Sequence, residues 1–296
     1  MNEATIDALV ALNERFYAAQ AKSFSETRRT SWPGWEHCLP YVQNAAHQQE
    51  SQRWCRLLDV ACGNLRFEAF LREQVPQVSF DVCAVDSCAP LAGEFAIAHV
   101  DDPGEAAGTV PFDVRFCELD VIGALRIGSA VCGAICDLAA ARCATRDSAI
   151  CDPAVRSSAS LFDVAVAFGF LHHVPTAHLR VRLLRELVQS VRPGGYVIVS
   201  FWGFLRDDRL REKALLSHER ALADLSLTPE EFDEGDFILG WQHERAAYRY
   251  CHSFTSRDVD ELAREVSDCA QVQARFFADG RTGNLNEYLV LRHIAR

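Results

Sequence analysis

The sequence predicts an α/β protein in which an open, mostly parallel sheet is doubly wound, with helices on both faces. Short apolar runs of strand length alternate with segments whose apolar residues recur at helical spacing. Polar residues follow the strand candidates at their carboxyl ends, the edge at which such sheets bind ligands. With 296 residues and 49% hydrophobic content, the chain is large enough to bury this core.

The first strand candidate is LLDVACGN, from Leu57 to Asn64. It reads as a buried strand that ends on an acid and turns through a glycine, where the backbone can approach a ligand. A helix from about Leu65 to Arg72 would point free N–H groups at that turn. Ala61 stands where a dinucleotide fingerprint carries its first glycine, which disfavours a nicotinamide or flavin site. Alone, this motif fits a strand-to-helix connection in any α/β protein.

The later elements repeat this arrangement. Strands are expected at Phe80–Val85, Val114–Leu119, Phe162–Phe168 and Tyr196–Phe201. The first two end at Asp86 and Asp120, and the third runs into Gly169–His173. The helix Leu179–Val191 is expected to stop at a turn formed by residues 192–195.

The flanking segments are expected to complete one domain over residues 1–296. An amphipathic helix, Asn2–Ala21, lies within a helical cap at 1–50, and the cofactor-binding core at 51–205 contains an insertion at about 123–160. Residues 206–255 would form a substrate lid. A helix and an edge hairpin would follow at 256–296.

Composition restricts the function classes. No apolar run is long enough to span a bilayer and no signal sequence is evident, so we expect a cytoplasmic protein without membrane partners. Several of the twelve cysteines lie in apolar strand or helix patterns, where a reduced thiol acts as a small hydrophobic group. Cys132, Cys136, Cys143 and Cys151 lack the regular spacing of a zinc site, so no metal is expected.

The net charge of −11 argues against an extended nucleic-acid surface. Arginines nevertheless cluster at Arg180, Arg182 and Arg185, and again at Arg206, Arg209, Arg211 and Lys213. Such clusters are usually solvated helix faces. The second lies near the ligand end of the sheet, where it could contact a polyanion.

Five motifs, in order, resemble those of class I S-adenosylmethionine-dependent methyltransferases. They are DVACGN, AVDS, CELDV, FDVAVAFGFLHHV and LRELVQSVRPGGYVIVSFW, and they cover Cys55 to Trp202. The resemblance implies a Rossmann-like, seven-stranded sheet with an antiparallel edge and a lid insertion, and S-adenosylmethionine as cofactor.

The same resemblance assigns cofactor contacts. Asp59 and Gly63, with Ala61 and Cys62 in the same turn, would border the methionine part, and Asp86 with Ser87 would hold the ribose hydroxyls. Asp120 and Val121 would meet the adenine, and Phe168 and Phe170 would line the pocket beside the sulfonium. Ala61 and Leu65 depart from the glycines of the family, which leaves the methionine contacts less firmly assigned than the ribose contact.

The flanks resemble the tRNA wobble-uridine methyltransferases that esterify 5-carboxymethyluridine. The shared pieces are Phe16-Tyr17 to Thr27-Arg28 with Trp32-Pro33, Leu171 to His173, and Tyr248 to Phe254 with Gly235-Asp236 ahead of it. This resemblance implies that Arg28 and Trp32 contact the cofactor. It also implies that His172, Arg249 and His252 are catalytic residues. It further implies tRNA and a small activating subunit as partners.

Two alternatives remain beside this hypothesis. One is a related enzyme that methylates a small acidic metabolite, and the other is a non-catalytic protein that binds the cofactor or activates a partner. Cofactor binding separates the last from the first two, and bulk tRNA as methyl acceptor separates those two from each other. A carboxylate acceptor is already nucleophilic at neutral pH, so esterification needs alignment but no general base.

Overall fold

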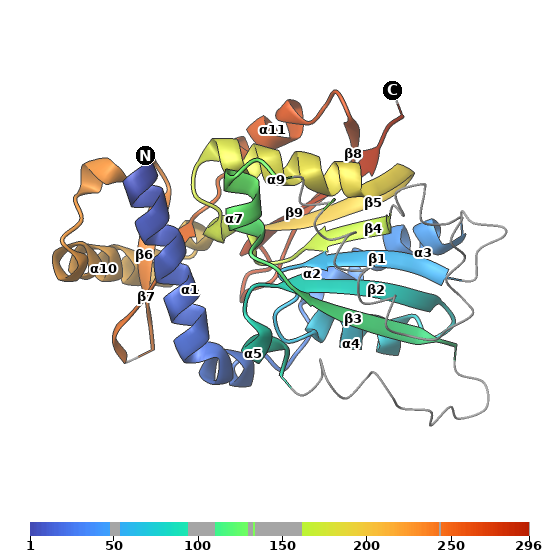
Figure 1. Cartoon of the computed structure of the whole chain (residues 1–296), viewed down its shortest axis with the longest axis horizontal. Coiled ribbons are helices and arrows are strands. Elements are labelled where there is room, and N and C mark those ends of the chain that lie inside the picture. Colours follow the sequence, from blue (N-terminus) through green and yellow to red (C-terminus); the bar gives the residue numbers. More distant parts are fainter. Residues whose placement is uncertain (48–53, 94–109, 130–132, 134–161, 243, 296) are drawn as a thin grey trace.

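The computed structural model describes residues 1–47, 54–93, 110–129, 133, 162–242 and 244–295. Its centre is a seven-stranded sheet in the order β3-β2-β1-β4-β5-β9-β8, in which only β9 runs antiparallel to its neighbours (Figure 1). The strands are β1 (Trp54–Val60), β2 (Ser79–Asp86), β3 (Phe112–Glu118), β4 (Phe162–Ala167), β5 (Val191–Trp202), β8 (Ala270–Ala278) and β9 (Asn286–His293). The predicted fold class, including the antiparallel edge, is therefore confirmed.

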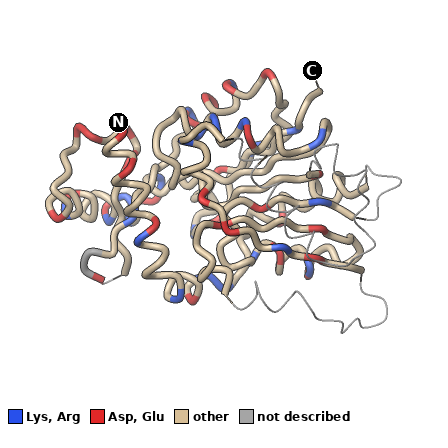
Figure 2. The backbone as a smooth tube through the Cα atoms, viewed as in Figure 1, with Lys and Arg blue, Asp and Glu red and all other residues tan. Residues whose placement is uncertain are grey.

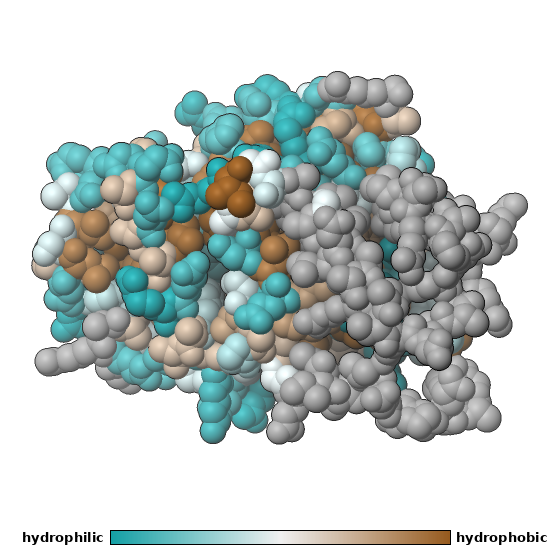
Figure 3. Space-filling view, in the orientation of Figure 1, coloured by the Kyte–Doolittle hydropathy of each residue, from teal (hydrophilic) through white to brown (hydrophobic). Residues whose placement is uncertain are grey.

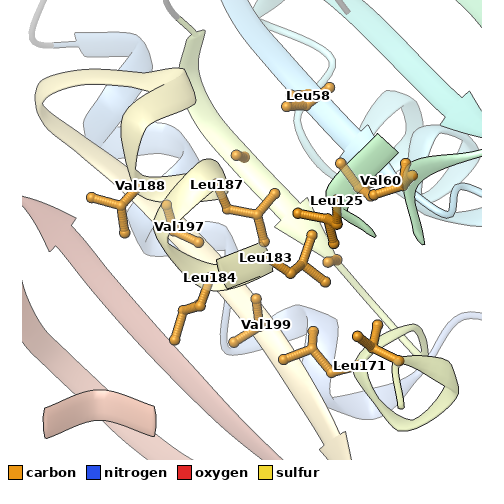
Figure 4. Close-up of a cluster of buried hydrophobic side chains, with 14 of the residues drawn as sticks. Leu58, Val60, Leu125, Leu171, Leu183, Leu184, Leu187, Val188, Val197 and Val199 are labelled. Carbon is orange, nitrogen blue, oxygen red and sulfur yellow. The ribbon is translucent and has the colours of Figure 1, made fainter. Parts of the chain in front are cut away.

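Helices cover both faces of the sheet. They are α1 (Glu3–Glu26), α2 (Pro33–Glu36), α3 (Leu39–His47), α4 (Arg66–Gln74), α5 (Ala89–Ala92), α7 (Val121–Arg126), α9 (Ala177–Ser190), α10 (Asp208–Leu225) and α11 (Ser256–Glu265). Alternate side chains of β1 separate the two faces: Leu58 packs under α7 and α9, whereas Leu57 packs against α3 and α4. Figure 4 shows the first of these cores, with Leu183, Leu184 and other aliphatic residues of α9 lying on β4 and β5.

One local prediction is wrong. Helix α9 ends at Ser190, one residue before the predicted end, and residues 192–195 belong to β5 instead of forming a turn. Phe162 pairs with Val191 and Val164 pairs with Tyr196, so the extra residues form a bulge within the strand. Gly195 has no room for a side chain, because a Cβ there would lie 2.8 Å from the carbonyl oxygen of Asp163.

A second, two-stranded sheet lies beyond the carboxyl ends of the parallel strands. It contains β6 (Asp236–Trp241) and β7 (Glu244–His252), and it packs against α10 on one side and α1 on the other (Figure 1). Three short 3₁₀ turns lie along the chain: η2 (Leu171–His173) between β4 and α9, η3 (Phe204–Arg206) between β5 and α10, and η4 (Pro229–Glu231) between α10 and β6. Because β7 contacts η2 and α1 contacts α5, this layer faces the ligand-binding edge of the main sheet. Most of the predicted insertion at 123–160 lies outside the described residues.

The described surface carries charges of both signs, interspersed along the chain (Figure 2), and the face seen in Figure 3 is mostly hydrophilic with scattered apolar residues. Among the described residues, no helix is both long and apolar enough to cross a membrane. No disulfide joins the described cysteines, and Cys62, Cys83 and Cys117 are buried, as expected for reduced residues in apolar elements. The four cysteines considered for zinc lie outside the described residues.

Candidate active site

A cavity of about 1030 Å³ opens at the carboxyl ends of β1, β2, β3 and β4. Pockets that hold one drug-sized ligand span roughly 300–1,000 Å³, so this cavity can admit a cofactor and an acceptor group together. Every residue predicted to bind the cofactor lines it: Arg28, Trp32, Asp59, Ala61, Cys62, Gly63, Asp86, Ser87, Asp120, Val121, Phe168 and Phe170. Of the predicted catalytic residues, His172 and Arg249 also line it.

The turn between β1 and α4 has left-handed backbone at three alternate residues. Ala61, Gly63 and Leu65 have φ values of 61°, 56° and 58°. Ala61 and Leu65 are the residues that replace family glycines, so the backbone keeps a glycine-like shape without the glycines. A Cβ on Gly63 would meet nothing within 4 Å, which is the open space that a ligand approaching this backbone requires.

We expect Ala61→Gly to stabilise the protein by about 1 kcal/mol, because left-handed backbone costs alanine roughly 1–2 kcal/mol and glycine's extra chain entropy offsets part of the gain. Urea unfolding measures the change. Ala69→Gly, at an exposed position of helix α4, is the control and should destabilise by about 1 kcal/mol. An equal loss of stability in both variants would show that the turn is not strained.

Asp86 connects this turn to the end of β2. Its two carboxylate oxygens accept hydrogen bonds from the backbone N–H groups of Gly63 (3.0 Å) and Cys88 (2.8 Å). Burial raises the pKa of Asp86, and these backbone donors oppose that rise. The carboxylate therefore has a fixed orientation beside the cavity, with lone pairs left for further donors.

The donor set fits S-adenosylmethionine. Asp59, Asp86 and Asp120 lie at or just beyond the carboxyl ends of neighbouring strands and supply acceptors for an ammonium group, ribose hydroxyls and an adenine amine. Asp120 also caps α7 by accepting a hydrogen bond from the N–H of Gly123 at 2.9 Å, which occupies one oxygen and leaves the other. The individual contacts remain proposals.

His172 and His173 line the cavity between the carboxyl ends of the parallel strands and β7. The Tyr17 hydroxyl lies 2.7 Å from Nε2 of His173, and Nδ1 of His173 lies 2.9 Å from the carbonyl oxygen of Tyr250. This pattern assigns the proton to Nδ1, which donates to the carbonyl while Nε2 accepts from Tyr17. His172 is buried, and its Nδ1 has no partner among the described residues. Both histidines line the cavity, whereas the sequence left open which of them would do so.

Burial and nearby cations keep both rings neutral. Burial lowers the pKa of His172 well below its usual value, and His173, Arg249 and Arg28 lower it further. Burial, followed by Arg249, lowers the pKa of His173 to about 3. Together with Cys251, these rings place three potential metal ligands within 4.8 Å of one another. Because two arginines face them and His173 already uses both nitrogens, this trio does not favour a cation.

Arg28 and Arg249 form a cationic patch over aromatic rings. The guanidinium carbon of Arg28 lies 3.5 Å from the centre of the Phe24 ring, and that of Arg249 lies 5.1 Å from the rings of both Phe16 and Trp241. Arg249 is buried, and its Nε and Nη1 have no hydrogen-bond partner among the described residues. Burial and the charge of Arg249 lower the pKa of Arg28 to about 10. Two like charges thus face one cavity.

His252 does not line the cavity, which argues against a catalytic role. Alternation along β7 sends Arg249 towards the cavity and His252 to the opposite face. There, Nδ1 of His252 lies 2.7 Å from Asp236, which also accepts hydrogen bonds from the Tyr250 hydroxyl at 2.7 Å and from Arg180 at 3.3 Å. Its buried position in this network indicates a structural role.

Sequence reasoning missed several parts of the site. Asn13 lines the cavity and joins α1 to β7 by accepting a hydrogen bond from the Tyr250 N–H at 2.7 Å. Asp279, in the edge hairpin, accepts from the Gly34 N–H at 2.9 Å and so anchors the segment that carries Trp32. The sequence did contain a signal for Asn13, since it is a polar residue on the apolar face of the predicted N-terminal helix. Nothing in the sequence indicated the role of Asp279.

Comparison with known proteins agrees with this architecture. The family described as methyltransferase domain matches residues 17–266. A SAM-dependent methyltransferase of Methanosarcina mazei shares the fold, with a TM-score of 0.55, 18% identity and coverage of 90% of this chain and 100% of that chain.

Two curated relatives match over short segments. A tRNA (carboxymethyluridine(34)-5-O)-methyltransferase of Arabidopsis thaliana is 37% identical over 46 residues, 16% of this chain and 11% of the relative. A probable tRNA methyltransferase 9B of Mus musculus is 30% identical over 69 residues, 23% of this chain and 15% of the relative. The matches therefore span a small part of either relative. Because the family match extends over most of the chain, the protein belongs to the methyltransferase domain family.

Proposed function

We propose that this protein is an S-adenosylmethionine-dependent methyltransferase that methylates a carboxylate, and that the acceptor is a 5-carboxymethyluridine-type wobble uridine in tRNA. The observation that carries the proposal is the pair Arg28 and Arg249. A buried guanidinium with two unpartnered nitrogens is costly unless an anion completes it, and a carboxylate matches its planar donors. The ring of Phe24, beneath Arg28, lines the same cavity and suits a flat, base-bearing acceptor.

The chain's own residues perform alignment and exclusion of water. S-adenosylmethionine supplies an electrophilic methyl group. Arg28 and Arg249 bind the acceptor carboxylate and orient one oxygen for in-line attack. His172 and Trp202, which pack together with ring centres 5.1 Å apart, close the cavity beside that oxygen. No group has to remove a proton, since the carboxylate is ionised above about pH 4.

We expect the single-turnover rate at saturating cofactor to stay nearly constant between about pH 6.5 and 9. The depressed pKa values of His172 and His173 keep both rings neutral over this range, and Arg28, with a pKa of about 10, remains a cation. His172→Asn should lower the rate moderately without adding a pH dependence, and His178→Asn, at an exposed position, should match the wild type. A steep rise from pH 6 to 8 that His172→Asn abolishes would indicate a general base.

The acceptor assignment is tested with tRNA that carries 5-carboxymethyluridine at the wobble position and with labelled S-adenosylmethionine. The expected product is a methyl ester, so mild alkali should release the label as methanol and mass analysis should place it on that nucleoside. Transfer of label in an alkali-stable form would contradict carboxylate methylation. Failure to label tRNA, together with labelling of a small acid, would contradict only the tRNA assignment.

The surface favours a second candidate, a small acidic metabolite. Arg206 donates to the buried carboxylate of Glu287 at 2.8 Å, and Arg211 pairs with Asp208, so the cluster expected to contact a polyanion is partly neutralised within the protein. Arg209 and Lys213 remain exposed on α10. The charges around α10 are mixed in sign (Figure 2), and tRNA binding would rely on few phosphate contacts.

A further inference from the structure

Two carboxyl groups meet under the turn between β1 and α4. Asp59 projects from β1 and lines the cavity, and Glu68 lies in the first turn of α4; each residue is only 3% exposed. Both carboxylate oxygens of Glu68 are buried without a hydrogen-bond partner among the described residues, and the two acids lie close enough to shift each other's pKa. Two neighbouring buried carboxylates without a cation or donor to neutralise them cannot both stay ionised, so one of the groups carries a proton.

No described cation neutralises this pair. Glu68 receives no hydrogen bond from any side chain among the described residues. Two arginines close to the pair in sequence contact other groups: Arg56 pairs with Asp81, and Arg66 donates to Asn64 and to the carbonyl of Thr30. The site is therefore a buried pair with unused capacity for a cation.

The other titratable groups near the pair strengthen proton retention. Asp86 is a third acid, and together with burial and Glu68 it raises the pKa of Asp59. Burial also raises the pKa of Glu68 to about 7, and that of the Cys62 thiol, which remains uncharged. The pair thus keeps a proton near neutral pH in the free protein.

We propose that Glu68 is a cofactor-positioning residue and that the Asp59–Glu68 pair exchanges its shared proton for the α-ammonium group of the cofactor. The ammonium brings one positive charge and one proton leaves to solvent, so the charge of the site is unchanged. This inference rests on the methionine end of the cofactor lying at Asp59. It does not depend on the acceptor.

Calorimetry in buffers with different ionisation enthalpies tests the proposal without any methyl transfer. S-adenosylhomocysteine carries the amino-acid end, whereas 5′-methylthioadenosine lacks it. At pH 6.5 an α-amino group with a pKa of about 7.7–8.0 is already protonated, so it takes up almost no proton on binding. We expect close to one proton released with S-adenosylhomocysteine and none with 5′-methylthioadenosine. Equal proton release with both ligands would overturn the proposal.

Variants of α4 give an independent test. The amide of Glu68→Gln donates to Asp59 permanently, so binding of S-adenosylhomocysteine should release no proton. Its dissociation constant should then be constant between pH 5.5 and 6.5, whereas that of the wild type should rise about tenfold as the pH falls by one unit. Glu73→Gln, exposed on the same helix, should behave as the wild type. Proton release by a folded Glu68→Gln protein would overturn the proposal; if that variant does not fold, the two-ligand comparison on the wild type still decides.

Discussion

Replacing Arg249 by Met should lower kcat/KM for the carboxylate acceptor by about 10²–10³-fold, or roughly 3–4 kcal/mol, and leave cofactor affinity unchanged. The methionine chain retains contact with Phe16 and Trp241 but cannot bind an anion. Arg249→Lys should also lose at least about tenfold, because one ammonium group cannot reproduce two parallel hydrogen bonds. Steady-state kinetics with calorimetry of cofactor binding measures both effects.

The stability of the same variant distinguishes an acceptor-binding arginine from a structural one. In the free protein the Arg249 guanidinium is buried with two unpartnered nitrogens. Its removal should therefore raise the free energy of unfolding by about 1–2 kcal/mol while activity falls. Arg264→Met, on the exposed face of α11, is the matched control and should change neither quantity. An Arg249→Met protein that is both destabilised and active would contradict the proposed role.

Selectivity for charge supplies a third comparison. Wild-type enzyme should be inhibited more strongly by 5-carboxymethyluridine than by its uncharged amide, 5-carbamoylmethyluridine. Arg249→Met should bind the two nucleosides about equally if the guanidinium reads the carboxylate. If Arg249→Met still prefers the charged nucleoside as strongly as the wild type does, Arg28 alone binds the carboxylate.

Sequence patterns predicted the parallel core well because burial on both faces leaves a strong signal. Leu57 and Leu58 point to opposite faces of β1 and both are buried, so a continuous apolar run was the correct indicator of a central strand. Acids that follow such runs meet at one edge by topology alone, which brought Asp59, Asp86 and Asp120 together around one cavity. These features need only local periodicity and the rules of parallel sheets.

Features that depend on packing between distant segments were not predictable in this way. The alternation of side chains along a strand predicts that Arg249 and His252 lie on opposite faces of β7. Which of these faces meets the cavity depends on the packing of α1 against that strand, which the sequence does not indicate. Glu68 reads as an ordinary acid in the first turn of a helix, and only the position of α4 buries it against Asp59. In the same way, the salt bridge of Arg206 with Glu287 needs the edge hairpin, whose register brings an acid from far along the chain.

Asp86→Ala should weaken S-adenosylhomocysteine binding by about 2–4 kcal/mol, the value of two charge-assisted hydrogen bonds with incomplete additivity. The structure adds a complication, because Asp86 also accepts hydrogen bonds from the N–H groups of Gly63 and Cys88. Loss of affinity alone therefore cannot separate a ribose contact from a disturbed turn. Calorimetry on a variant whose circular dichroism spectrum matches the wild type gives the primary measurement.

A ligand cycle separates the two causes. Wild-type protein should bind 5′-methylthioadenosine more tightly than its 2′-deoxy analogue, because one hydroxyl donor to Asp86 is missing from the latter. If Asp86 accepts that hydrogen bond, Asp86→Ala should bind the two ligands equally, and the coupling free energy should be about 1.5–3 kcal/mol. If Asp86 acts only by holding Gly63, the variant should weaken both ligands by the same factor and keep the preference for the 2′-hydroxyl. That outcome would assign the ribose to another acceptor, since a group that fixes the turn without touching the sugar has no means of sensing one hydroxyl.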